Sequence, residues 1–441
     1  MSSAATALRG LRIPATRRRS RGQARRIAPP LEHRILLTAT FCLLAFGAVM
    51  VYSSSSPIGV LNGSGYGTGE FVQYLVAGCI GLGAMKVLER HGLSLFTAPI
   101  VRLLLLGAFA LLLAVMVPGI GVDLGGARRW FQAGPLQFQP SELMKLALVL
   151  YVARYLADNP KRLRRGFKTA LAPVGIVAGP ACLLIALEPD LGTTLVVAFA
   201  LIALLIAGGI PMRWIGGVVA IGVGVVAVML LAKPYQAARL AAFLHPWAAS
   251  TAKTVGYQAA QGQIALGSGG LFGVGLGKSV QKLLYLPEAQ TDFILAVIGE
   301  ELGVLGICGV VVLYGMIAYA GLRTARRAAS RYAKLLATGL TSLIVCQGIL
   351  NIFVVLGIAP LTGVPLPFIS YAPTNLCVML ASIGLLLNIS RPAARRLRAL
   401  DDDSEASGTA RGRELAAGRD RSRRDGGARR AGTGGRRRAA S

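Results

Sequence analysis

Long apolar segments alternate with short polar segments along most of this chain. A helix needs about 20 mostly apolar residues to cross the hydrocarbon core of a bilayer. Ten segments meet that requirement, and they cover residues 35–53, 71–88, 99–117, 141–157, 169–187, 191–209, 214–232, 293–321, 335–358 and 373–389. The pattern therefore predicts an all-α polytopic membrane protein, built as a ten-span helical bundle.

The longest polar interruption, residues 233–292, separates the seventh and eighth predicted spans. It is rich in glycine and contains no span of its own, and it is far longer than a connector needs to be. We expect this large extracytoplasmic loop to fold over the outer mouth of the bundle, where it forms the lid or wall of a site.

The positive charge of the chain lies mainly at its two ends. The net charge is +28, nine of the 47 Lys and Arg residues fall in residues 1–34, and fifteen, all Arg, follow residue 390. Such ends are typical of disordered tails that contact anionic lipid headgroups, and nucleic acid binding is the minor alternative. The expected organisation is a basic disordered cytoplasmic N-tail (1–34), a membrane domain (35–390) and an Arg-rich disordered cytoplasmic C-tail (391–441).

The charge of the loops predicts the orientation of the spans. Lys and Arg collect in cytoplasmic loops, and here they alternate with loops that carry none, so that both termini are expected on the cytoplasmic side. The basic residues that depart from this alternation fall in the two longer outer loops, and among them Arg128, Arg129, Lys278 and Lys282 need a reason of their own.

The composition excludes several classes of protein. Apolar residues make up 54% of the 441 residues and charged residues 15%, a balance that soluble domains rarely show. The six cysteines form no CxxC pair, so that neither disulfides nor a zinc site is indicated. The first 34 residues contain no apolar core followed by a small-residue cleavage site, and we expect no cleavable signal.

The stretch from Tyr285 to Gly303, which leads into the eighth predicted span, carries four acids: Glu288, Asp292, Glu300 and Glu301. An acid in the hydrocarbon costs about 2.5 to 3.5 kcal/mol and is a functional candidate by default. On a helix that starts near Asp292, Glu300 and Glu301 lie about 80° and 180° away from it, while its own face carries small residues, Ala296, Gly299 and Gly303. Asp292 is therefore either a catalytic group or a helix N-cap, and we expect Glu300 and Glu301 to be structural.

A second candidate is the stretch "GARRWFQAGPLQFQPSELMKLALVLY". It joins Arg129 and Trp130 to a helix start that carries Glu142 and Lys145 one turn apart. Arg and Lys at such a place donate well to phosphate. The structural alternative is an interfacial aromatic belt with a surface Glu–Lys pair worth about 0.2 to 0.5 kcal/mol.

Two further motifs have simpler interpretations. Glu188 and Asp190 lie in an outer turn between two spans, where they either bind a cation or cap the helix that begins at Leu191. The stretch "GSGGLFGVGLGKS" ends like a phosphate-binding loop, but Phe272 stands where the GxxxxGK[ST] spacing needs glycine. We therefore reject an ATPase.

Four blocks together resemble a known family: "RRWFQAGPLQFQPSELMKL", "EPDLGTTLV", "YQAAQGQIALGSGGLFGVGLGKSVQKLLYLPEAQTDFILAVIGEELG" and "NIFVVLGIAPLTGVPLPFISY". They are similar to the SEDS family (shape, elongation, division and sporulation), typified by FtsW and RodA, and they stand in family order over about residues 35–390. The stretch "YLPEAQTDFILAVIGEELG" is closer to the FtsW form. The resemblance implies a ten-span bundle in the bacterial plasma membrane, and it agrees with the count of spans above.

The resemblance also implies an activity, namely the polymerisation of lipid II, an undecaprenyl-pyrophosphate disaccharide pentapeptide, into peptidoglycan glycan strands. It implies a class B penicillin-binding transpeptidase as partner, among other divisome or elongasome proteins. The family's catalytic Asp falls on Asp292, and its functionally sensitive positions fall on Arg129, Trp130, Glu142 and Lys145.

The chain departs from the family pattern at three places. It has Gln290 in place of His, His245 in place of Asp, and Ala372–Asn375 in place of a Gly-Gly-Ser turn. The last change puts Pro373 into a turn that is normally rich in glycine, and it leaves open a paralogue with altered partners.

On this basis we expect Asp292 to be the general base of an inverting transfer that forms a β-1,4 linkage. A pyrophosphate leaving group needs no second carboxylic acid, because cations or a divalent metal such as Mg²⁺ or Mn²⁺ can take its charge. The expected pyrophosphate donors are Arg129 and Lys145, with Lys278 and Lys282 as additional candidates. No metal ligand is assigned.

Two other classes of function stay open. A lipid II flippase would distribute acids and bases through the depth of the bilayer, whereas here they gather on the predicted outer side. A non-catalytic divisome scaffold that recruits enzymes through its Arg tails would tolerate the loss of Asp292.

Overall fold

The computed structural model describes residues 30–61, 68–124, 127–134, 136–161, 166–232, 234–248, 256–283 and 285–391. Ten long helices lie in these residues, and they follow the predicted spans in order. They are α1 (Leu31–Leu61), α2 (Gly69–Leu95), α3 (Ala98–Met116), α4 (Pro140–Asp158), α5 (Phe167–Leu187), α6 (Leu191–Gly208), α7 (Met212–Ala232), α10 (Ile294–Arg327), α11 (Arg331–Val355) and α12 (Pro373–Ser390).

Most of these helices have the length and composition of membrane spans. Among the described residues, eight helices are long and apolar enough to cross a membrane. The other two predicted spans are α4, which carries four charged side chains, and α7, whose apolar part Met212–Val228 is shorter. The prediction of a polytopic helical membrane protein is therefore confirmed.

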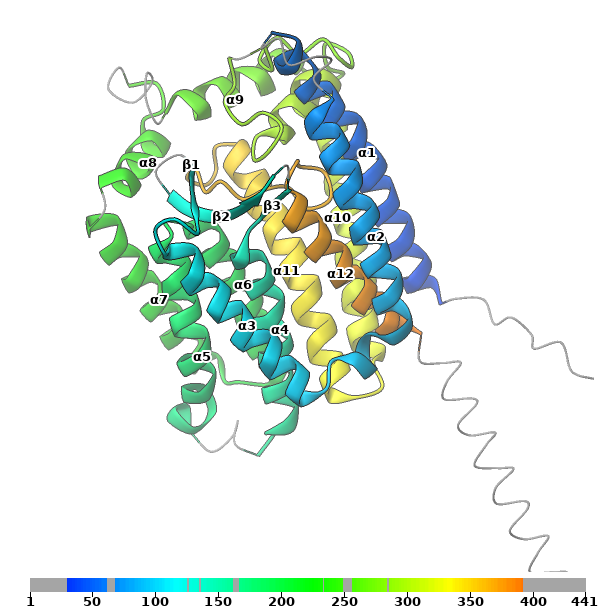
Figure 1. Ribbon diagram of the computed structural model, residues 1–441, viewed down its shortest axis with the longest axis vertical. Helices are drawn as coiled ribbons and strands as arrows, with labels where there is room; N and C mark the ends of the chain where they lie inside the picture. Colours follow the sequence, from blue (N-terminus) through cyan, green and yellow to red (C-terminus); the bar gives the residue numbers. More distant parts are fainter. Residues whose placement is uncertain are drawn as a thin grey trace, which may run out of the picture.

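The bundle has buried central helices and lipid-facing outer ones. Figure 1 shows the long helices packed side by side, and α11 and α12 are largely buried whereas α2 and α3 expose most of their side chains. The packing of α2 against α12 is close enough to require glycine. A methyl group added at Gly81 would lie 2.6 Å from Leu380 Cδ1, and one added at Gly92 would lie 2.8 Å from Leu385 Cδ2. Small residues at such contacts allow helices to approach in a bilayer.

A small sheet joins α3 to α4, and the sequence analysis did not predict it. Strands β1 (Val122–Leu124), β2 (Ala127–Ala133) and β3 (Leu136–Phe138) pair antiparallel in that order. The rings of Phe131 and Phe138 stack at 6.4 Å, as is usual for aromatic cross-strand pairs. The sheet lies toward the same end of the bundle as the large loop (Figure 1).

The large loop between α7 and α10 contains no spanning helix, as predicted, but part of it is helical. It forms α8 (Pro234–Leu244) and α9 (Tyr257–Gly269), which lie toward one end of the bundle (Figure 1). The apposition of α9 and α10 is so tight that a methyl group at Gly269 would lie 1.9 Å from the main-chain oxygen of Gly299. The loop is therefore packed onto the bundle.

The eighth span is not one continuous helix, which corrects the sequence analysis. Gly303 has φ 66° and ψ −163°, so the helical path of α10 breaks there. The segment after α9 crosses the break and satisfies its backbone groups. The amides of Val274 and Gly275 donate to the main-chain oxygens of Glu300 and Glu301, at 2.9 and 3.0 Å. Since an unpaired backbone group in lipid costs several kcal/mol, this docking makes the break possible.

The two predicted tails lie outside the described residues, apart from residues 30–34 and Arg391. The helix α1 begins at Leu31, within the last residues of the predicted N-tail. Its first turn is tied to the end of α10, since the carboxylate of Glu32 pairs with the guanidinium groups of Arg323 at 2.7 Å and Arg327 at 2.6 Å.

Candidate functional site

Asp292 lies just before α10, in the turns that close the large loop. The N-cap of α10 is Phe293, and the carboxylate of Asp292 accepts hydrogen bonds from Thr291 Oγ1, at 3.3 Å, and from its own backbone amide. The alternative that Asp292 caps the helix is therefore wrong. The side chain is half-buried, and its carboxylate is left available for chemistry.

The surroundings of Asp292 hold its pKa close to neutrality. Burial and, less strongly, the negative charge of Glu288 raise the pKa of this carboxyl to about 7, while the charge of Arg239 acts in the opposite direction. A general base works best when its pKa lies near the working pH. The environment of Asp292 thus suits a group that accepts a proton.

Sequence reasoning missed two residues that affect Asp292. One holds its backbone in place, and the other acts on its charge. Asn351 of α11 donates from Nδ2 to the main-chain oxygen of Asp292 at 2.7 Å and to that of Val364 at 2.8 Å. Arg239 of α8 donates to the main-chain oxygen of Leu361 at 3.4 Å. Asn351 is the first residue of the block "NIFVVLGIAPLTGVPLPFISY", which carries part of the family resemblance, so the sequence did contain a signal for this residue.

The segment between α11 and α12 connects Asp292 to the turn between α5 and α6. A methyl group at Gly363, which has φ 69°, would lie 3.9 Å from Oδ2 of Asp292. On its other side, the segment packs on Gly192 of α6, where a methyl group would lie 2.3 Å from Val364 and 2.6 Å from the main-chain oxygen of Thr362. Asp292 and the α5–α6 turn therefore flank residues 362–364.

The α5–α6 turn holds Asp190 as a cap. Its Oδ1 accepts from the amide of Thr193 at 3.0 Å, and its Oδ2 accepts from Gln139 Nε2 at 3.1 Å. Capping, the structural alternative for this acid, is confirmed. Both carboxylate oxygens are thus engaged at the N-terminus of α6.

Glu188 in the same turn is buried in an unusual state. It is 3% exposed, and neither oxygen of its carboxyl group has a hydrogen-bond partner among the described residues. Burial and, less strongly, the charge of the neighbouring Asp190 raise its pKa to about 8, while Arg129 acts in the opposite direction. Glu188 is therefore protonated at neutral pH.

Arg129 and Trp130 lie on β2, which holds them at the same end of the bundle. Arg129 donates from Nε to the main-chain oxygen of Glu188 at 2.6 Å and from Nη2 to that of Pro189 at 2.7 Å. Trp130 is half-buried and pairs with Val122 of β1. The structure brings Arg129 to the α5–α6 turn, and its role toward substrate stays a prediction.

Glu142 and Lys145 are a buried pair, so the estimate for a surface pair does not apply to them. Lys145 Nζ lies 2.8 Å from Glu142 Oε2 and donates to Gln347 Oε1 at 2.8 Å. Asn375 donates to Glu142 Oε2 at 2.7 Å, so the unusual turn at Ala372–Asn375 supplies a partner to this pair. The network ties α4 to α11 and α12, and the donation of Lys145 to pyrophosphate stays a prediction.

Lys282 and Lys278 lie in the segment that follows α9. Lys282 Nζ pairs with Glu301 Oε1 at 2.7 Å, which confirms Glu301 as a structural acid. Glu300 accepts hydrogen bonds from Ser279 and, at 3.0 Å, from the amide of Val280, so it is structural as well. Lys278 is exposed. The described contacts bring neither lysine to Asp292.

The small residues that follow Asp292 on α10 are packed against protein. A methyl group at Gly299 would meet Leu266 of α9 at 2.4 Å, and Ala296 is fully buried. The space beside this stripe is filled by α9. The described residues also contain no cluster of three or more His, Cys, Asp or Glu side chains that could hold a metal.

Comparison with known proteins identifies the family. The model of the FtsW, RodA and SpoVE cell cycle proteins matches residues 34–395. The probable peptidoglycan glycosyltransferase FtsW of Legionella pneumophila is 39% identical over 365 residues, which are 81% of this chain and 91% of the relative. Stage V sporulation protein E of Bacillus subtilis is 37% identical over 361 residues, 81% of this chain and 96% of the relative.

Solved structures agree with this assignment. A chain of a peptidoglycan synthase complex that coordinates polymerization and crosslinking matches with a TM-score of 0.65 and 28% identity, over 83% of this chain and 98% of that chain. The rod shape determining protein RodA of Thermus thermophilus matches with a TM-score of 0.59 and 27% identity, over the same shares. The resemblance to the SEDS family is confirmed, and the chain belongs to the FtsW, RodA and SpoVE family of cell cycle proteins.

Proposed function

We propose that this protein is a peptidoglycan glycosyltransferase, which polymerises lipid II into β-1,4 glycan strands during bacterial cell division or cell-shape maintenance. The observation that carries the proposal is the carboxylate of Asp292, which has a near-neutral pKa and no capping role at the mouth of a polytopic bundle. The similarity to proteins named peptidoglycan glycosyltransferase supports it.

The proposed reaction uses Asp292 as the base. The 4-hydroxyl of a GlcNAc unit gives its proton to the Asp292 carboxylate, while its oxygen forms a bond to the anomeric carbon of MurNAc on the opposite face from the lipid pyrophosphate. The bond from that carbon to the pyrophosphate oxygen breaks, and the pyrophosphate leaves as an anion. The anomeric centre is inverted, and general base catalysis of this kind contributes about 10² to 10⁴ in rate.

The charge of the leaving pyrophosphate needs cations nearby. Arg129 beside the α5–α6 turn and Arg239 beside Asp292 are the described cations that the geometry favours for this role. Lys145 is held by the buried carboxylate of Glu142, so its charge is already balanced. The described contacts of Lys282 hold it at Ser53 and Glu301 and do not bring it to Asp292. Because the described acids form no cluster of three ligands, no step of the mechanism is assigned to Mg²⁺ or Mn²⁺.

The similarity to a chain of a peptidoglycan synthase complex supports a partner for this protein. The proposed partner is a class B penicillin-binding transpeptidase, which would cross-link the strands as they form. The protein is a multi-pass membrane protein, and its proposed location is the bacterial plasma membrane with both termini in the cytoplasm. The similarity to FtsW proteins supports a role in division.

The test is glycan-strand synthesis from purified lipid II by the full chain with its transpeptidase, compared with Asp292→Asn. The two proteins must match in thermal stability and in partner binding. Polymer from the native chain alone is the expected result. Polymer from both would remove Asp292 as base, and polymer from neither, with divalent cation supplied, would favour a flippase or a scaffold. Retention of configuration would exclude the single-displacement mechanism.

A further inference from the structure

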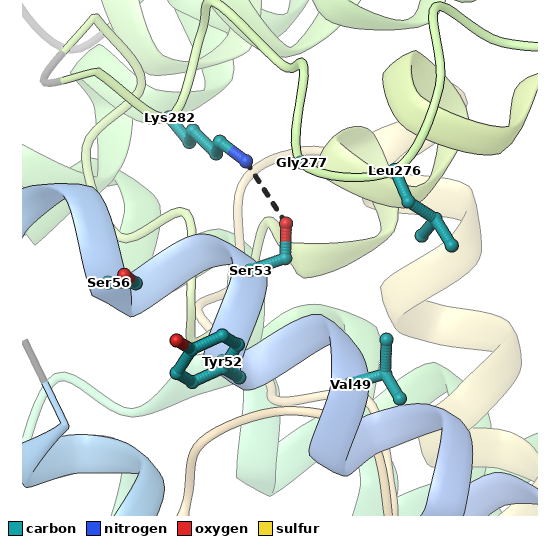
Figure 2. A pocket seen from close by; sticks show the side chains of 7 residues that line it. All are labelled: Val49, Tyr52, Ser53, Ser56, Leu276, Gly277 and Lys282. Atoms are coloured by element: carbon teal, nitrogen blue, oxygen red, sulfur yellow. Dashed lines mark hydrogen bonds between the residues drawn. The ribbon is translucent and has the colours of Figure 1, made fainter.

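A cavity of about 360 Å³ lies between the outer half of α1 and the segment that follows α9. Figure 2 shows Lys282 reaching from that segment toward Ser53 on α1, with Leu276 on the opposite side. Its volume falls within the range of small-molecule sites, about 300 to 1,000 Å³. The residues that line it are Val49, Tyr52, Ser53, Ser56, Leu276, Gly277 and Lys282.

The polar side of the cavity is built around Lys282. This lysine is 3% exposed, and its Nζ donates to Ser53 Oγ at 3.0 Å and to Glu301 Oε1 at 2.7 Å. An ammonium group has three N–H donors, and these contacts use two of them. Ser56 adds a hydroxyl to the lining, and the exposed Lys278 follows Gly277 at the rim.

The rest of the wall is mainly apolar and about half exposed. Val49, Tyr52 and Leu276 are 51%, 49% and 56% exposed, although each is a large hydrophobic side chain. Phe41 continues the same face of α1 two turns below Val49, and it is 46% exposed. A ligand with a polar head in the cavity could therefore extend an apolar chain along this face of α1.

The cavity also lies at the depth where lipid headgroups begin. From Leu31 to Ser53 is 22 residues of α1, or about 33 Å at 1.5 Å per residue. The hydrocarbon core of a bilayer is about 30 Å thick. With the proposed orientation, Ser53 and Lys282 stand at the outer boundary of the hydrocarbon, and Val49 lies just inside it.

We propose that this cavity binds the phosphate headgroup of an anionic outer-leaflet phospholipid, whose acyl chain lies along the exposed face of α1. A phosphate oxygen accepts from the third N–H of Lys282 and from the hydroxyl of Ser56, because the hydroxyl of Ser53 already donates to Glu301, and the ammonium of Lys278 supplies charge at the rim. A transmembrane helix of a partner would present apolar side chains to this place and leave the Lys282 donor without an acceptor.

The bound lipid would brace the break in α10. The contacts of Lys282 already join α1, the segment after α9 and α10 through Ser53 and Glu301, and that same segment satisfies the backbone at Gly303. A ligand that binds only the folded arrangement raises its stability. The site is distinct from the proposed glycosyltransferase centre, so its test is a binding and stability measurement that does not depend on polymerisation.

The experiment measures lipid binding to the full chain in detergent, by native mass spectrometry and by the shift in apparent Tm. Phosphatidylglycerol, phosphatidylcholine and undecaprenyl phosphate are the three probes. Val49→Trp fills the cavity, and Lys278→Glu reverses the charge at its rim. The matched controls are Leu103→Trp on the exposed face of α3, which is 71% exposed, and Lys168→Glu at the exposed start of α5.

We expect phosphatidylglycerol to bind and to raise Tm. Both cavity variants should lower the affinity for this lipid about tenfold or more, Val49→Trp because it fills the cavity and Lys278→Glu because it removes a charge-assisted contact. The controls should keep native affinity. Equal binding of phosphatidylcholine, or equal affinity in Val49→Trp, would overturn the proposal. Binding of undecaprenyl phosphate alone would assign the site to the substrate lipid instead. Loss of transpeptidase binding in Val49→Trp, with lipid binding intact, would assign it to the partner.

Discussion

The side-chain amide of Asn351 donates to the main-chain oxygen of Asp292 at 2.7 Å, and its second N–H donates to Val364 at 2.8 Å. One amide group thus uses both of its donors to hold the turn before α10 against the segment between α11 and α12. Gly363, which precedes Val364, lies beside the Asp292 carboxylate. Asn351 therefore fixes the position of the proposed base without touching its reactive atoms.

The first prediction concerns this positioning role. Asn351→Leu keeps the size of the side chain but removes both donors, which leaves two carbonyl groups unpaired at about 1 to 3 kcal/mol each. A displacement of about 1 Å at a catalytic group can cost about 10² in rate, so we expect kcat for polymerisation to fall by about 10- to 100-fold. Steady-state assays with lipid II and the partner would measure it.

The control is a half-buried asparagine whose side-chain amide also donates to a main-chain oxygen. Asn388 of α12 donates to the main-chain oxygen of Glu89 at 2.8 Å, in the ion-pair network near the opposite ends of the helices. Asn388→Leu should lower the thermal stability to a similar degree and leave kcat close to native. Equal losses of kcat in the two variants would mean that Asn351 contributes stability alone.

The hydrophobic pattern predicted the helices well because membrane spans must be long, apolar and internally hydrogen-bonded. The predicted span 99–117 became Ala98–Met116, and 373–389 became Pro373–Ser390. The capping role of Asp190 also followed from a rule that is local to the chain. These features depend on residues within one helix or at its ends.

Other features depend on contacts between distant segments, which one sequence does not reveal. The break at Gly303 exists because residues 270–275 supply hydrogen bonds to it, and a periodic pattern cannot show that docking. Arg239 was missed because it looks like an ordinary charge on a short loop helix, although its charge acts on Asp292. The partner of Lys282, Glu301, became evident only after the loop had folded back onto α10.

The second prediction concerns pH. The pKa of Asp292 is raised to about 7 by burial and then by Glu288, and a general base acts only when deprotonated. Polymerisation by the native chain should therefore rise as pH increases through about 7. Glu288→Gln removes a negative charge and should move this limb to lower pH, whereas Arg239→Gln should move it to higher pH. Profiles of kcat between pH 5.5 and 8.5 would test both shifts.

Lys168→Gln, at the exposed start of α5, provides the matched control for these charge changes. It should leave the acid limb of the profile in place. Shifts of Glu288→Gln and Arg239→Gln in the same direction would contradict Asp292 as the titrating group, because the two charges act on it with opposite signs.

The third prediction concerns the buried carboxyl of Glu188. Its folded pKa of about 8 is above its ordinary value of 4.5, so its contribution to stability is full below pH 4.5 and is lost as pH rises to 8. Between these values the loss is about 1.4 kcal/mol per pH unit. Glu188→Gln cannot titrate. The apparent Tm of this variant, relative to that of the native chain, should therefore increase from pH 5 to 8 and stay constant from pH 8 to 9. A difference that is the same at every pH would contradict the assigned protonation state.

The fourth prediction concerns the break in α10. Gly303→Ala forces a side chain into a backbone region that is nearly exclusive to glycine, and its Cβ would lie 2.5 Å from the carbonyl of Leu271 and 2.6 Å from the amide of Gly273. Strain and overpacking together should cost about 2 to 6 kcal/mol, measured as a lower apparent Tm and a smaller monodisperse fraction in detergent. Gly309→Ala, two turns further along the same helix, meets no atom within 4 Å and should gain about 0.5 to 1 kcal/mol. If both variants were as stable as the native chain, residues 270–275 would not be docked on the break, and the bracing proposed for the lipid would lose its basis.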